Sequence, residues 1–125
     1  MKLTLIISDF SIKNQIYNGF KPSAKHSLTK KLVNALFSKR WVVIPLGGKQ
    51  FYKIYIENKH YRAVVHELDV TNQVFLLVYF RSKDDPASEN ISNYQNESSE
   101  RILYNHLKAT ECLKSNRVHI LEFEK

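Results

Sequence analysis

The sequence of 125 residues contains a single cysteine, Cys112, and no long hydrophobic run. One cysteine excludes an intrachain disulfide and a four-cysteine zinc site, which disfavours a small secreted scaffold and favours an intracellular, reducing setting. The apolar N-terminus, residues 1–7, is too short for a signal peptide and far short of the roughly 20 residues that span a bilayer. We therefore expect a cytoplasmic protein with no membrane partner, in which residues 2–8 form a strand.

Motifs for metals and for phosphate loops are also missing. None of the five histidines has the HxxxH spacing of a helical metal site, and no cysteine or carboxylate completes one. The pair Gly47 and Gly48 lacks the lysine, the hydroxyl residue and the helix that follow in a phosphate-binding loop. Cys112 has no implied His and Asn partners, and a lone cysteine is usually a small core residue. We expect neither a metal nor a cofactor.

Negative charge is scarce, with 12 acidic residues against 19 lysines and arginines, which gives a net charge of +7. The apolar fraction of 43% indicates a packed globule rather than a disordered basic tail. The length supports one domain over residues 1–125. The positive charge attracts polyanions, so nucleic acid is a candidate partner. In many basic proteins, however, the charge is only solvated by water and serves no binding partner.

Two amphipathic helices are predicted near the N-terminus. Apolar residues of the first recur every four positions, at Ile12, Ile16 and Phe20. Asp9 or Ser11 can cap this helix, and the break at residues 19–23 separates it from a second helix with an apolar stripe over residues 28–37. The two helices are expected to form a hairpin.

The C-terminal third divides into a polar and an amphipathic part. Residues 84–98 read as a polar surface loop, after a core region that spans residues 1–83. Residues 99–125 then predict one amphipathic helix, followed by Val118 to Phe123 as an edge strand or a tail.

A β-hairpin in the middle of the chain allows its register to be derived. Residues 51–57 and 60–68 have strand patterns, and Asn58 and Lys59 suit a two-residue loop. Counting outward pairs Tyr55 with Arg62, which leaves one face apolar and gathers polar residues on the other. That polar face carries Lys53, Tyr55, Arg62 and His66. Residues 74–80 are continuously apolar, as in a central strand covered on both faces, and lead into Arg81 and Lys83.

The cations of this hairpin face, together with Arg81 and Lys83, form the main candidate site. Cleaving a phosphodiester without a metal requires cations that hold the phosphate and neutralise the transition state, and a Tyr, His or Lys that moves protons. Lys53, Tyr55, Arg62, His66 and Arg81 supply these residue types. The alternative interpretation is a solvated basic face that only keeps the protein in solution.

Three segments resemble the RelE/ParE superfamily of bacterial toxin-antitoxin toxins. They are residues 51–56 (FYKIYI), residues 61–65 (YRAVV) and residues 74–83 (VFLLVYFRSK). The resemblance implies an α+β fold, in which a small antiparallel β-sheet packs on an N-terminal helical hairpin, here with an extra C-terminal helix. It also implies an antitoxin partner, and either messenger RNA cleavage on the ribosome or inhibition of DNA gyrase.

The resemblance also assigns roles to individual residues. Arg62 falls on the family arginine that contacts the scissile phosphate, Lys53 falls on the first sheet lysine, and Arg81 and Lys83 fall in the basic segment after the last core strand. This chain departs from the family in having Tyr55 where a second lysine is frequent. It also continues for about 40 residues beyond the usual end.

We therefore predict a metal-independent, ribosome-dependent endoribonuclease toxin that acts on messenger RNA. The ribose 2′-OH attacks its own phosphate, Arg62 and Arg81 stabilise the transition state, Lys53 assists the base, and Tyr55, His66 or the loop residue Tyr94 supplies the acid. Further lysines expected to bind RNA are Lys30, Lys31, Lys49 and Lys83. The alternatives are a gyrase inhibitor and a non-catalytic basic module that binds nucleic acid or an acidic protein.

Overall fold

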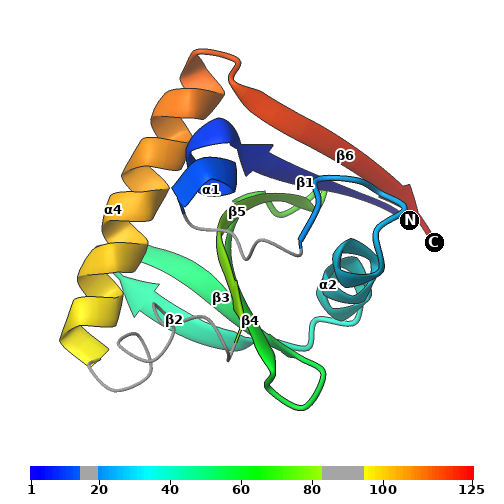
Figure 1. The fold of residues 1–125 in the computed structure, drawn as a ribbon, viewed down its shortest axis with the longest axis horizontal. Helices are drawn as coiled ribbons and strands as arrows, with labels where there is room; N and C mark the ends of the chain where they lie inside the picture. The colour runs from blue at the N-terminus through cyan, green and yellow to red at the C-terminus, as the bar shows by residue number, and fades with distance from the viewer. Residues whose placement is uncertain (15–19, 83–94) are drawn as a thin grey trace.

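The computed structural model describes residues 1–14, 20–82 and 95–125 of the chain. These residues form a six-stranded sheet with helices on both faces (Figure 1). The elements follow one another as β1 (Lys2–Ser8), α1 (Asp9–Asn14), α2 (Ser27–Phe37), β2 (Val42–Leu46), β3 (Lys49–Ile56), β4 (Tyr61–Asp69), β5 (Val74–Ser82), α4 (Gln95–Lys114) and β6 (Val118–Glu124).

The sheet is mixed, with the strand order β2-β3-β4-β5-β1-β6. The β1 strand runs parallel to β5, and every other neighbouring pair is antiparallel. A central position suits β1 because its residues are apolar on both faces: Leu5 faces one helix layer and Ile6 the other. The prediction of a purely antiparallel sheet is therefore wrong.

Helices α2 and α4 cover opposite faces of the sheet (Figure 1). The apolar stripe of α2, with Leu28, Leu32 and Leu36 four positions apart, packs on the main core. On the other face, Ile102 and Ala109 of α4 pack on apolar residues of β3, β4 and β5. The fold therefore has three layers, with the sheet in the middle.

The predicted N-terminal helical hairpin is also wrong. The first helix, α1, is only six residues long and contacts α4, β1 and β5, whereas α2 packs over β1 and β3. The first helix begins after Ser8, whose hydroxyl oxygen accepts a hydrogen bond from the Ser11 backbone N–H at 3.0 Å, so Ser8 takes the capping role predicted for Asp9 or Ser11. Ile16, which was expected to extend this helix, lies outside the described residues.

The predicted register of the β3–β4 hairpin is confirmed. Tyr55 pairs with Arg62 and Ile54 with Ala63, and the loop residues Asn58 and Lys59 both have positive φ angles. The fully apolar segment in β5 is buried, as predicted for a strand covered on both faces. Val118–Glu124 forms an edge strand, β6, which pairs with β1 along its whole length.

Candidate nucleic-acid interface

The central feature of the site is a row of three side chains across three strands. Tyr55 of β3 pairs with Arg62 of β4, and Arg62 pairs with Arg81 of β5. Directly opposed residues point to the same face of a sheet, so the register brings these three predicted site residues together. The row lies on the same face of the sheet on which Ile102 of α4 packs.

The ring of Tyr55 is flanked by two lysines. Lys53 Nζ lies 5.2 Å from the ring centroid and Lys59 Nζ lies 5.4 Å from it, while 40% of Tyr55 remains exposed. Both distances fall within the range of cation–π contacts. Lys59 was not among the predicted site residues, although its place in the hairpin loop next to β3 could have indicated it.

Tyr79, a buried phenol two residues before Arg81 on β5, lies on the same sheet face as these cations. Burial raises the pKa of Tyr79 to about 12; the phenol of Tyr55, which carries negative charge when ionised, acts in the same direction, and the positive charges of Arg62, Arg81 and Arg101 act in the opposite direction. Tyr79 therefore stays protonated at neutral pH. Arg101 comes from α4, and the sequence could not assign it to the site because its position depends on how that helix crosses the sheet. We call Lys53, Tyr55, Lys59, Arg62, Arg81 and Arg101 the basic cluster.

The structure separates His66 from the basic cluster. His66 follows Arg62 by four residues, which is about 13 Å along an extended strand. Its Nδ1 lies 3.1 Å from the Gln50 carbonyl oxygen, and its ring centroid lies 4.7 Å from that of His106 on α4. The buried residues Phe51 and Val64 share this face with His66. The α4 helix therefore covers a part of the hairpin face that the sequence predicted to be exposed to solvent. His66 is therefore not positioned to serve as the acid beside Arg62.

The lysines predicted to bind RNA lie in different places. Lys30 and Lys31 belong to α2 on the opposite face of the sheet, and Lys31 forms an ion pair with Glu57. Lys49 begins β3, and its charge contributes to the lowered pKa of His106. Lys83 and Tyr94 lie outside the described residues.

The chemistry available at the basic cluster follows from its composition. Arginine guanidinium groups hold phosphate oxygens in a fixed fork, and an exposed aromatic ring accepts a stacked base.

In residues 1–14, 20–82 and 95–125, no group of three or more His, Cys, Asp or Glu side chains is arranged to hold a metal ion. No helix within these same ranges is long and apolar enough to cross a membrane.

Comparisons with known proteins add no relatives. No family model, no curated protein and no solved structure matches this chain. The resemblance to RelE/ParE toxins therefore stays a prediction that rests on three short segments.

Proposed function

We propose that the basic cluster binds single-stranded RNA. The observation that carries this proposal is the row Tyr55, Arg62 and Arg81, in which an exposed ring flanked by two lysines stands beside two arginines. The arginines hold successive backbone phosphates, and one base stacks on the face of Tyr55. A sheet that carries cations around an exposed aromatic ring combines the two contacts by which proteins hold single strands.

A single strand fits this surface better than a duplex. Stacking on a tyrosine requires a base that has left its own stack, which single strands provide without the cost of breaking base pairs. Each base stacked on an aromatic side chain contributes about 1–3 kcal/mol to binding. Tyr55 therefore adds affinity for single strands, whereas the lysines and arginines attract any polyanion.

Phosphodiester cleavage is the second candidate, and it is favoured by two arginines that face one tyrosine. In this reaction the ribose 2′ oxygen loses its proton to a solvent water and attacks the adjacent phosphorus, Lys53 stabilises the developing oxyanion, and Tyr55 donates a proton to the departing 5′ oxygen. Arg62 and Arg81 neutralise the additional charge of the five-coordinate phosphate. The products are a 2′,3′-cyclic phosphate and a free 5′-hydroxyl. The toxin activity, antitoxin partner and ribosome dependence are proposed with this candidate.

The binding proposal is tested with a fluorescent single-stranded RNA oligonucleotide. Arg62→Ala should weaken binding by about tenfold or more, because a charge-assisted hydrogen bond to phosphate contributes about 1.5–3 kcal/mol. Lys30→Ala is the matched control, since it removes the same charge from α2 on the other face. Equal losses for both variants would contradict the proposal, because net charge alone would then explain the binding.

The cleavage proposal is tested by expressing the chain in bacteria and mapping RNA ends. Growth arrest with cuts phased to the ribosome supports the toxin, and Arg62→Ala should abolish both while Arg62→Lys restores little, because lysine lacks the guanidinium fork. A gyrase inhibitor would stop growth through DNA damage and would tolerate Arg62→Ala. Binding of RNA without any cleavage would leave the non-catalytic module.

A further inference from the structure

A separate cavity lies between α1 and the C-terminal half of α4. Its volume is about 390 Å³, and its wall is formed by residues of both helices and by Arg117, which precedes β6. Volumes of this size are at the lower end of those that hold small organic ligands. Glu111, which lines this cavity, follows Arg101 of the basic cluster by ten residues, about 15 Å along the helix. The cavity is therefore a different site from the basic cluster.

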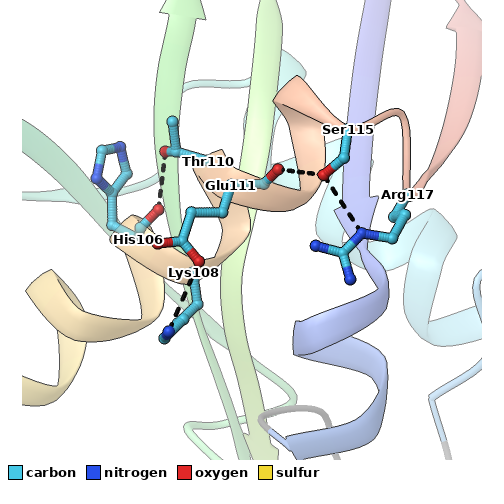
Figure 2. Close-up of polar contacts among 6 residues, drawn as sticks. All are labelled: His106, Lys108, Thr110, Glu111, Ser115 and Arg117. Atoms are coloured by element: carbon cyan, nitrogen blue, oxygen red, sulfur yellow. Dashed lines mark hydrogen bonds and ion pairs between the residues drawn. The ribbon is translucent and has the colours of Figure 1, made fainter.

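Each carboxylate of the cavity has a basic side chain beside it. Asp9 Oδ1 lies 3.5 Å from His119 Nε2, and Glu111 Oε2 lies 3.6 Å from Lys108 Nζ (Figure 2 shows the second pair). Each carboxylate has a second oxygen that can accept a hydrogen bond from a ligand. Both acidic side chains therefore remain able to bind hydroxyl groups.

Two cations of the cavity are left for an anion. Within the described part of the chain, Lys13 forms no ion pair and no hydrogen bond through its side chain. The side chain of Arg117 donates only from Nε, to Ser115 Oγ at 3.3 Å, and Figure 2 shows this contact at the end of α4. Its two terminal guanidinium nitrogens therefore keep four N–H donors for a ligand.

We propose that this cavity binds a small phosphate monoester of the size of a nucleoside monophosphate. Lys13 and Arg117 hold the doubly charged phosphate, which an arginine fork and a lysine point charge recognise together. Asp9 and Glu111 accept hydrogen bonds from ligand hydroxyls such as those of a ribose, and Phe10 gives the cavity an apolar wall. This inference does not depend on the RNA-binding proposal, because it uses none of the basic cluster.

The test is calorimetric titration of the purified full-length chain with AMP, inorganic phosphate and adenosine. We expect AMP to bind more tightly than phosphate, and adenosine to bind at least tenfold more weakly than AMP. Lys13→Ala and Arg117→Ala should each weaken AMP binding by about tenfold or more. Both side chains are exposed, so neither change should unfold the domain, and a thermal melt verifies this. Lys13→Gln and Arg117→Gln replace any alanine variant that fails to fold.

The same titration separates this cavity from the basic cluster. AMP should bind the wild type and Arg62→Ala with the same affinity, and should bind the Lys13→Ala/Arg117→Ala double variant at least tenfold more weakly. The proposal is overturned if AMP does not bind at millimolar concentration, or if the double variant binds it like the wild type. It is also overturned if Arg62→Ala removes AMP binding, because the phosphate would then occupy the basic cluster.

Discussion

His106 makes a specific pH dependence of stability testable. Its ring lies on α4 with its centroid 5.3 Å from that of Phe51 and 4.7 Å from that of His66. Burial lowers the pKa of His106 from its ordinary value of 6.5 to about 4, and the neighbouring charges of His66 and Lys49 act in the same direction. The folded protein therefore holds His106 neutral, and protonation of this ring opposes the packing of α4 on the sheet.

The sign and the size of the effect follow from these two pKa values. Between pH 6.5 and 4 the unfolded chain binds a proton at His106 that the folded chain does not, so stability is fully present above pH 6.5 and falls as the pH is lowered towards 4. The full pKa difference corresponds to a loss of about 3 kcal/mol, at 1.36 kcal/mol per pKa unit. His106 is only half-buried, so solvent screening reduces the expected loss to about 1–2 kcal/mol.

Urea denaturation between pH 7 and pH 4.5 measures this loss. His106→Phe keeps an aromatic ring against Phe51 but removes the titrating group, so the wild type should lose about 1–2 kcal/mol more than this variant on acidification. Leu107→Ala changes the exposed neighbouring residue of α4 and should follow the wild-type pH curve. If the free energies of unfolding of the wild type and of His106→Phe fall by the same amount over this pH range, then burial between α4 and the sheet does not hold His106 neutral and the reasoning is refuted.

Three further predictions follow from the fold and the basic cluster. The association constant for RNA should fall as salt is added, and a plot of its logarithm against the logarithm of the salt concentration should have a slope of about −3. This slope is expected if four cations of the cluster each neutralise a phosphate of a single strand. A slope near zero would contradict the electrostatic basis of binding. Ile54→Ala should reduce the free energy of unfolding by about 3 kcal/mol in urea denaturation, because Ile54 is fully buried in the main core, and an unchanged midpoint would contradict that packing. Deletion of residues 115–125 removes β6, which pairs with β1 along its length and packs Leu121 and Phe123 on the core. The melting temperature should therefore fall sharply. An unchanged melting temperature would show that β6 does not support the sheet.

The local pairing of β3 and β4 could be predicted from the sequence. Alternation with a period of two assigns each residue to a face, and the short loop at Asn58 and Lys59 fixes which residues are opposed. A slip of one residue would bury Arg62 and expose Ile54, so only one register is stable. For the same reason, the sequence alone predicts that Tyr55 lies beside Arg62.

The covering of the polar hairpin face could have been predicted only in part. Phe51 and Val64 share this face with Lys53 and Arg62, and two apolar residues among cations indicate that something packs on them. The pattern does not indicate which element supplies that cover. In the structure α4 does so, and it places His106 against His66 while it brings Arg101 towards Tyr79.

The features that depend on neighbours along the chain follow from the amino-acid pattern: the hairpin register, the buried β5 strand and the apolar stripe of α2. Tertiary structure alone decided the features that join distant segments. These are the insertion of β1 between β5 and β6, the position of α4 over the hairpin, and the cavity between α1 and α4. The physical reason is that periodicity specifies which side of an element is apolar, whereas the choice of its partner depends on packing between residues far apart in the chain.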